Sequence, residues 1–353
     1  MVVLGVDPHK QTHTVVAVDE NGKRLGQLTV KARRQGHLRA LRWARGFGEH
    51  LVWGIEDCRG VTGNLVRDLL AAGEELVMVP TKLMAQCRSS ARTPGKSDPI
   101  DAEAVARGVL REPDLPRAHL DEESLDVRLV VDHREHLVAE RTRMINRLRW
   151  HLVDLDPDLE PPAKAMTSQS RLRRLIVDLG ALPPRRRRGI AIEQAERILD
   201  DSIRINQLER EIIRMVTPLA PALLALPGVA GLTAAKLIGE IAGIERFRNQ
   251  AQLANLAGAA CIPVWTGNRE KHRLNRGGNR QINPALHRIA TTQIRYYPPA
   301  AALYHRRRTE HSDTKAGAKR VLKRHLVNVV FTAMRNDARN RNQAANLSSK
   351  TAA

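Results

Sequence analysis

VVLGVDPHKQTHTVVAVDENGKRLGQLTVKA, residues 2–32, has the pattern of three consecutive strands. VVLGVD is a short apolar run of the kind that forms a buried strand. HTVVAVD and RLGQLTVKA lie on either side of the turn ENGK, whose Asn21-Gly22 pair is a hairpin signal. We therefore expect the chain to begin with a three-stranded meander.

The segments that follow alternate between helix and strand patterns. Expected helices cover residues 35–48, 63–73, 81–90 and 98–111, and expected strands cover residues 51–57 and 75–80. A three-stranded meander that leads into βα units is typical of a mixed sheet of the RNase H type. The fold class expected for the N-terminal domain is therefore α/β and RNase H-like.

The remainder of the chain has mainly helical patterns. Residues 124–155 combine apolar steps of three and four with dense charge, which predicts a long amphipathic helix. Further helices are expected over residues 171–180 and 191–216, and the run PPRRRR (183–188) between them is predicted as a solvated loop, with phosphate contact as the alternative. From Pro218 onward we expect short helices, a Gly-rich turn and a basic loop that leads into a helix.

Charge points to a polyanionic partner. The 353 residues include 58 Lys or Arg and 38 Asp or Glu, a net charge of +20, and residues 251–353 hold 19 basic against 4 acidic side chains. Nucleic acid is the simplest partner for such a surface. Aromatic residues make up 3%, which argues against a surface built mainly from stacking aromatics.

Cysteine usage and hydropathy further restrict the classes of protein to which the chain can belong. Cys58, Cys87 and Cys261 are odd in number and far apart, which disfavours a disulfide framework or a zinc site and favours a reducing cytosol. No apolar run approaches the roughly 20 residues of a membrane span, so we expect no membrane segment.

Four carboxylates fall at positions where this fold would bring them together. Asp7 ends the first expected strand, Glu56 ends the fourth, and Asp98 and Asp101 face one side of a helix start. Oxygen ligands suit Mg²⁺, and paired metal ions suit phosphodiester chemistry. Each residue also has an ordinary explanation: helix capping for Asp98 and Asp101, a turn for Asp7, and an exposed strand end for Glu56. Alternation along the strand would point the neighbouring Asp57 the other way.

Two further segments have the composition of phosphate-binding loops. In LPGVAGLT (226–233), Gly228 and Gly231 would let backbone N–H groups approach a phosphate, and a tight interhelical turn is the alternative. Thr266 stands beside Gly267 among cations, so it is either a nucleophile or part of a phosphate-binding loop. The residues predicted to contact nucleic acid are Gly228, Gly231, Arg269, Lys271, Arg273, Arg276, Asn279, Arg280, Arg320, Lys323 and Arg324.

These motifs together resemble a known family. The matching segments are GVDPHKQTHTVVAVDENG (5–22), WGIED (53–57), KSDPIDAEAVAR (96–107), LPGVAGLTAAKLIGEI (226–241), QLANLAGAA (252–260), WTGNREKHRLNRGGNRQINPALHRIA (265–290) and KRVLKRHLVNVV (319–330). They resemble the IS one-ten family of insertion-sequence transposases, which is related to the Piv-type DNA invertases. The resemblance extends over roughly residues 1–335 and includes the DEDD set of acids.

The resemblance implies an architecture with four parts. They are a RuvC-like catalytic domain (1–118), a helical coiled-coil connector (119–217), a mainly α C-terminal transposase domain with a helix-hairpin-helix-like element (218–335) and a flexible tail (336–353). It also implies a homodimer that pairs into a tetramer, working in the bacterial or archaeal cytoplasm at the nucleoid.

The resemblance further implies a chemistry. Members cut and rejoin DNA with Mg²⁺, for which Mn²⁺ is the alternative, held here by Asp7, Glu56, Asp98 and Asp101. They use a C-terminal serine as nucleophile and resemble recombinases guided by a bridge RNA that pairs with donor and target DNA. This chain has Thr266 at the serine position, and the β-methyl group stiffens the side chain and adds bulk near the attacking oxygen. Cys261 stands where proline is expected.

We therefore expect a transposase or recombinase that moves an insertion sequence. Two alternatives remain open from the sequence. One is a RuvC-like structure-specific endonuclease that hydrolyses DNA with water. The other is a nucleic-acid-binding remnant in which Thr266 has disabled the chemistry.

Overall fold

The computed structural model divides the chain into two compact units, Met1–Glu122 and Glu123–Ala353. It describes residues 1–56, 61–90, 95, 97–112, 114–118, 120–159, 161–162, 165–267 and 269–351, with the side chains of residues 266, 269–271, 345 and 348–351 outside the description. Asp57, Cys58 and Asn268 therefore lie outside the described residues. Of the described helices, none combines the length and apolar character that crossing a bilayer requires.

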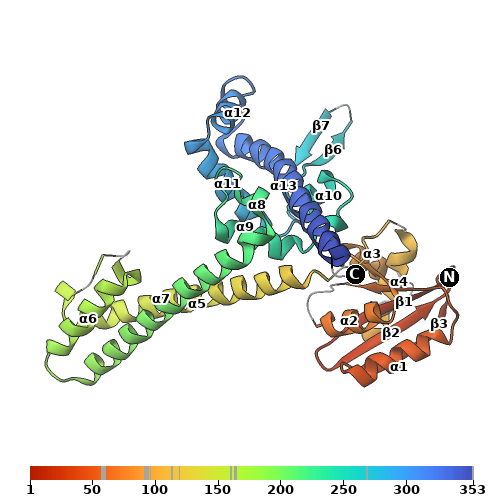
Figure 1. The fold of residues 1–353 in the computed structure, drawn as a ribbon, viewed down its shortest axis with the longest axis horizontal. Helices are drawn as coiled ribbons and strands as arrows, with labels where there is room; N and C mark the ends of the chain where they lie inside the picture. Colours follow the sequence, from red (N-terminus) through yellow and green to blue (C-terminus); the bar gives the residue numbers. More distant parts are fainter. Residues whose placement is uncertain are drawn as a thin grey trace. The chain divides into compact units, whose positions relative to one another are not determined.

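A five-stranded mixed sheet forms the centre of the first unit (Figure 1). The meander β1–β2–β3 is antiparallel, β4 and β5 extend it with parallel pairing, and the strand order is β3-β2-β1-β4-β5. This topology confirms the RNase H-like fold predicted from the sequence. The strands are β1 (Val2–Pro8), β2 (Thr12–Val18), β3 (Arg24–Lys31), β4 (Leu51–Ile55) and β5 (Glu75–Met78).

Helices cover both faces of this sheet. One core cluster joins strand residues such as Trp53 to Ala40 and Leu65 of the first two helices, and a second joins Val3 and Val16 to the next two helices. Burial on both faces explains why β1 is an uninterrupted apolar run. The helices are α1 (Arg34–Arg45), α2 (Gly63–Ala71), α3 (Thr81–Ser89) and α4 (Asp98–Arg111).

Gly5 sets the close approach of α4 to β1. A Cβ at this position would lie 1.9 Å from the Ala102 carbonyl oxygen and 2.5 Å from the Ala106 backbone nitrogen. Only glycine therefore lets the backbone of α4 pack directly on the central strand. The acids at the start of α4 depend on this packing for their position.

Two stacked histidines lie in the core of the first unit. The rings of His13 on β2 and His37 on α1 are 5.4 Å apart, and His37 Nδ1 lies 2.6 Å from Asp68 Oδ2. Burial, with a smaller contribution from His37, lowers the pKa of His13 from 6.5 to about 4. His13 therefore stays neutral in the folded protein at pH values where the unfolded chain would protonate it.

This lowered pKa makes the stability of the first unit depend on pH. Between pH 6.5 and 4 the unfolded state binds a proton that the folded state does not, so stability falls as pH falls through this window and is retained above it. We expect His13→Gln to remove about 2 kcal/mol of this loss, measured as urea midpoints at several pH values. The exposed His50→Gln serves as the control. An unchanged pH slope in His13→Gln would contradict the assignment.

Two long helices and a shorter one form the first part of the second unit. They are α5 (Glu122–Leu155), α6 (Gln169–Ala181) and α7 (Arg186–Leu219), with 3-10 turns η1 (Pro157–Leu159) and η2 (Ala165–Thr167) between α5 and α6. Ion pairs join α5 to α7, at 2.7 Å for Arg134 and Glu209 and 2.9 Å for Arg187 and Asp154. Arg186–Arg188, predicted as a loop, are the first turn of α7, because arginine is a good helix former.

The C-terminal part is a helical core that includes the ends of α5 and α7. Val127 of α5 and Val216 of α7 belong to the same core cluster as the later helices. The elements are α8 (Pro221–Leu224), α9 (Gly231–Ile241), η3 (Ile244–Arg246), α10 (Gln250–Leu256), α11 (Ile282–Tyr296), α12 (Pro298–Thr309) and α13 (Lys315–Thr351). The segment 336–351, predicted as a flexible tail, is the last part of α13 and buries Asp337 and Ala338.

A β-hairpin stands among these helices where the sequence predicted a basic loop (Figure 1). Strands β6 (Ile262–Thr266) and β7 (Arg269–Arg273) pair antiparallel over five residues each. The turn between them begins at Gly267, whose φ of 58° is in the left-handed region that glycine adopts at no steric cost.

Candidate active site

The sheet brings the ends of β1 and β4 to one edge. Asp7 lies near the end of β1, and Glu56 follows directly after β4. Because β1 and β4 are parallel neighbours, their last residues lie side by side. Asp98 and Asp101 occupy the first turn of α4, which packs on β1. Three elements, β1, the end of β4 and α4, therefore supply four acids to one region of the first unit.

Three side chains at this edge lie within ligand distance of one another. His9 Nε2 lies 3.3 Å from Asp7 Oδ2 and 3.2 Å from Asp98 Oδ1. The ligand atoms of Asp7, His9 and Asp98 all fall within 4.8 Å. His9 was not among the residues predicted from the sequence, although its place two residues after Asp7 in VDPHK was an available signal.

Asp7 lies among other negative charges. Burial raises the pKa of Asp7, and the negative charges of Asp98, Asp101 and Glu56 raise it further. His9 acts in the opposite direction and lowers the pKa. The site is therefore a concentration of negative charge that a cation would relieve.

Asp101 has a different neighbour from the other acids. Arg88 on α3 donates a hydrogen bond from Nη1 to Asp101 Oδ1 over 2.9 Å. Asp101 is mostly buried, whereas Asp98 is half exposed. Arg88 thus fixes one carboxylate oxygen of Asp101. No pattern in the sequence distinguishes this arginine from the many others.

The donor set fits a divalent cation. Carboxylate oxygens are the ligands that Mg²⁺ and Mn²⁺ prefer, and the three clustered side chains offer ligand atoms at a spacing one ion could bridge. The like charges around Asp7 give a physical reason for a counter-ion at this position.

The Gly-rich turn of the second unit has a packing explanation for each glycine. Gly228 has a φ of 79°, and a Cβ at Gly231 would lie 2.7 Å from Ile213 Cγ1 of α7. A pocket of about 580 Å³ beside the turn is lined in part by Thr233 and Arg288. The tight-turn interpretation therefore accounts for both glycines, and phosphate contact remains a prediction.

A basic pocket of about 780 Å³ lies in the second unit between the foot of the hairpin and α13. Asp313 is the only carboxylate among its described lining residues, and Arg307 Nε pairs with it at 2.6 Å. The pocket therefore has a large excess of positive charge. The predicted nucleic-acid residues that line it are Arg273, Arg276, Asn279, Arg280, Arg320, Lys323 and Arg324.

Lys323 lies among like charges in this pocket. Its Nζ donates a hydrogen bond to Asn283 Oδ1 over 2.6 Å, and this acceptor belongs to a neutral amide. Burial lowers the pKa of Lys323, and the charges of Arg320 and Lys319 lower it further. An anion in the pocket would relieve both the burial cost and the repulsion.

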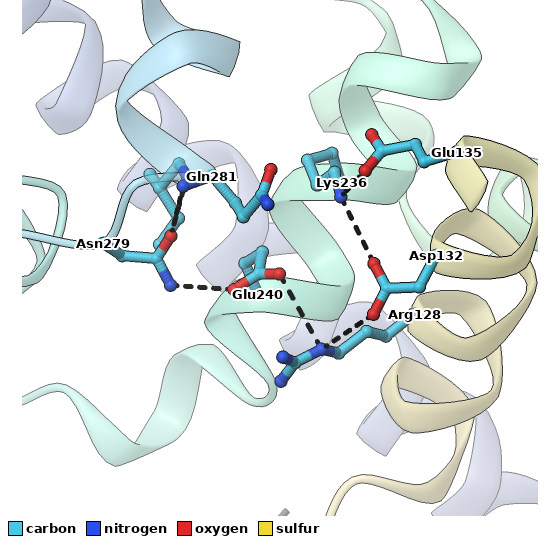
Figure 2. A network of polar contacts seen from close by, with 8 residues as sticks. Arg128, Asp132, Glu135, Lys236, Glu240, Asn279 and Gln281 are labelled. Atoms are coloured by element: carbon cyan, nitrogen blue, oxygen red, sulfur yellow. Dashed lines mark hydrogen bonds and ion pairs between the residues drawn. The ribbon is translucent and has the colours of Figure 1, made fainter. Parts of the chain in front are cut away.

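A buried polar network holds the loop that carries Arg276 and Arg280 (Figure 2). Glu240 of α9 accepts a hydrogen bond from Asn279 Nδ2 over 2.7 Å and lies 3.7 Å from Arg128 Nε of α5. Asn279 Oδ1 also accepts from the backbone of Gln281 over 2.7 Å. The Asn279 side chain, predicted to contact nucleic acid, is thus used in positioning this loop.

The same helix α9 carries a second buried charge in this network. Lys236 Nζ lies 2.8 Å from Glu135 Oε2 and 3.4 Å from Asp132 Oδ1, both on α5 (Figure 2). Lys236 and Glu240 are each at most 5% exposed. Buried charges of this kind are tolerated because each has partners of opposite charge.

Thr266 is the last residue of β6, at the tip of the hairpin. The register pairs Thr266 with Arg269, Val264 with Lys271, and Ile262 with Arg273. Three basic positions of β7 therefore stand opposite alternate positions of β6. Thr266 belongs to the second unit, whereas the four acids belong to the first.

The mixed sheet of the first unit has carboxylates at the ends of its first and fourth strands and on the helix α4. This combination defines a class of enzyme. The first unit is that of an RNase H-like enzyme acting on the phosphodiester backbone of nucleic acid. The chain matches two family descriptions, "Transposase" (the DEDD group) over residues 4–157 and "Transposase IS116/IS110/IS902 family" over residues 220–305.

Proteins of two insertion elements and one solved structure are similar to the chain. The 44.8 kDa protein of insertion element IS116 from Streptomyces clavuligerus is 26% identical, over 87% of this chain and 88% of its own. The 42 kDa protein of insertion element IS900 from Mycobacterium paratuberculosis is 23% identical, over 96% of each chain. The solved RuvC of T. thermophilus, in complex with a Holliday junction substrate, is 18% identical over 33% of this chain and all of its own, with a TM-score of 0.27.

The chain belongs to the IS110 family of insertion-sequence transposases. It is an enzyme that cuts and rejoins DNA, as the resemblance in the sequence implied.

Proposed function

We propose that this transposase performs its DNA chemistry at the edge of the sheet where Asp7, Glu56, Asp98 and Asp101 gather. The observation that supports the proposal is geometric: Asp7 and Glu56 stand at the ends of parallel neighbouring strands, and His9 Nε2 lies 3.3 Å from Asp7 Oδ2 and 3.2 Å from Asp98 Oδ1. The four acids would hold Mg²⁺, with Mn²⁺ as the alternative. When bound, the ion neutralises phosphate charge and stabilises the charge that develops during strand cleavage.

Two neighbours would keep the acids in place. His9 contacts both Asp7 and Asp98, so it holds the carboxylates of β1 and α4 at a fixed separation. Arg88 occupies one oxygen of Asp101 and leaves the other for a ligand. We assign both residues a positioning role.

We propose Thr266 as the nucleophile. Its hydroxyl oxygen would bond to phosphorus while the bond from phosphorus to the leaving sugar oxygen breaks, and the hydroxyl proton would end on that leaving oxygen. The reverse step restores a phosphodiester, so exchange needs no external energy source. The basic residues that follow Thr266 in the sequence support the proposal, since cations near the attacking oxygen would stabilise the negative charge of the transition state.

The partners follow from the same chemistry. The basic pocket, together with Arg269, Lys271, Gly228 and Gly231, would contact nucleic acid. The resemblance to the family supports a bridge RNA as guide, a homodimer that assembles into a tetramer, and work in the cytoplasm at the nucleoid.

The test follows labelled donor DNA with Mg²⁺ and the co-expressed flanking RNA. We expect a covalent protein–DNA band in the wild type and in Thr266→Ser, and none in Thr266→Ala, because alanine has no attacking oxygen. Thr309→Ala, on exposed helix α12, is the matched control and should keep the band.

Each of the other possible outcomes would indicate a different function. Cleavage that depends on Asp7 without any covalent band, even when religation is blocked, would indicate a structure-specific endonuclease that uses water. Salt-sensitive binding without Mg²⁺-dependent products would indicate a binding remnant. A band in Thr266→Ser alone would show an assembled site with an impaired nucleophile.

A further inference from the structure

An exposed tryptophan lies on the hairpin that carries Thr266. Trp265 of β6 is 69% exposed, whereas Trp53 is fully buried in the sheet core. Indole is a large apolar surface, and leaving it in water costs free energy that contact with a partner would recover.

The hairpin has no core of its own to explain this side chain. None of the described hydrophobic clusters includes a residue of β6 or β7, and Ile262 at the foot of the hairpin is 43% exposed. A lone two-stranded hairpin is marginally stable in water. Packing within the described part of the protein therefore does not account for the exposed Ile262 and Trp265 side chains.

The charge around the hairpin identifies the partner as a nucleic-acid strand. Arg273 and His272 belong to β7 and also line the basic pocket at the foot of the hairpin. An anionic backbone bound in that pocket would meet the foot of the hairpin at these two residues. The hairpin register pairs Trp265 with Glu270 and Pro263 with His272, so Trp265 lies on the same face of the hairpin as His272, which lines the pocket.

We infer that the hairpin and the basic pocket bind an unpaired DNA strand, with phosphates in the pocket and one base stacked on Trp265. A base within a duplex has both faces covered by its neighbours, so only an unpaired base offers a face to the indole. Arg320 and Lys323 supply charges for the backbone from α13. The inference rests on the proposed function because it names the form of DNA held beside Thr266.

The experiment measures binding of the full-length protein to fluorescein-labelled oligothymidine by anisotropy at one fixed salt concentration. We expect Trp265→Ala to weaken binding about tenfold and to have no effect on an abasic strand of equal length. Trp265→Phe keeps a ring and should restore most of the affinity. Trp150, which is 77% exposed on α5, provides the matched control Trp150→Ala, with no expected effect.

A variant in the basic pocket tests the proposed phosphate contacts separately. Arg320→Ala should weaken the intact and abasic strands equally and should reduce the salt dependence by about one phosphate contact. Equal loss for both strands in Trp265→Ala, or no loss, would overturn the stacking assignment. Tighter binding of a duplex or of oligouridine would overturn the assignment to an unpaired DNA strand.

A further variant distinguishes failure of the strand-binding site from failure of the proposed catalytic site. Asp7→Asn should leave oligothymidine binding intact while it removes cleavage. If strand binding ignores Trp265 while cleavage still needs Asp7, the inference fails alone. If cleavage ignores Asp7 while Trp265 still stacks, the proposed catalytic site fails and the strand site stands.

Discussion

Replacing Asp7 by asparagine should lower the rate of DNA cleavage by at least about a thousandfold, because the proposed site would lose a charge that holds the metal ion and with it several kcal/mol of transition-state stabilisation. Asparagine keeps the size of the side chain and removes the negative charge. The negative charges of Asp98, Asp101 and Glu56 all raise the pKa of Asp7, which agrees with a position close to all three. Single-turnover cleavage of labelled donor DNA measures the effect.

The control is a carboxylate of the same unit that lies away from this edge. Glu20 is exposed in the turn after β2, and Glu20→Gln should cleave at the wild-type rate. Thermal unfolding of both variants checks that the sheet is retained. A wild-type rate in Asp7→Asn would refute the acidic site as the site of cleavage.

Gly5→Ala should have the largest effect on stability. The added Cβ would overlap the Ala102 carbonyl oxygen, so α4 must move away from β1. Overpacking against backbone atoms costs about 3 kcal/mol or more. The same movement displaces Asp98 and Asp101, so cleavage should fall with stability. Denaturant titration of the full chain and the cleavage assay measure the two effects.

Gly180→Ala is the matched control because the Cβ at this position of α6 meets nothing within 4 Å. Alanine favours a helix over glycine by about 0.5–1 kcal/mol, so this variant should gain stability. A wild-type denaturation midpoint in Gly5→Ala would show that α4 does not need close contact with β1.

The order of elements in the first unit was predictable because its signals are local. Apolar runs, the Asn21-Gly22 turn and helical spacing each involve a few adjacent residues, and together they specify the meander and the βα units. The expectation that Asp7 and Glu56 lie together came from the positions that the first and fourth strands take in an RNase H-like sheet. These parts of the site needed no knowledge of side-chain contacts.

Other features depend on contacts that a sequence pattern does not contain. His9 was missed because its role comes from its distance to Asp98, a residue far along the chain. The β6–β7 hairpin was missed because β6 contains Pro263 and β7 is almost wholly polar, so neither has a typical strand pattern. The place of Arg88 beside the acids is evident only from its hydrogen bond to Asp101.

The buried network of Figure 2 limits how this enzyme can be recombined with its relatives. Lys236 and Glu240 of α9 need the opposite charges of Glu135 and Arg128 on α5. A chimera that takes α5 from another protein and keeps this α9 would leave a charge buried without its counterpart, at a cost of about 3–5 kcal/mol. The two helices should therefore be exchanged as one cassette, and substitutions at their charged positions should co-vary among functional chimeras.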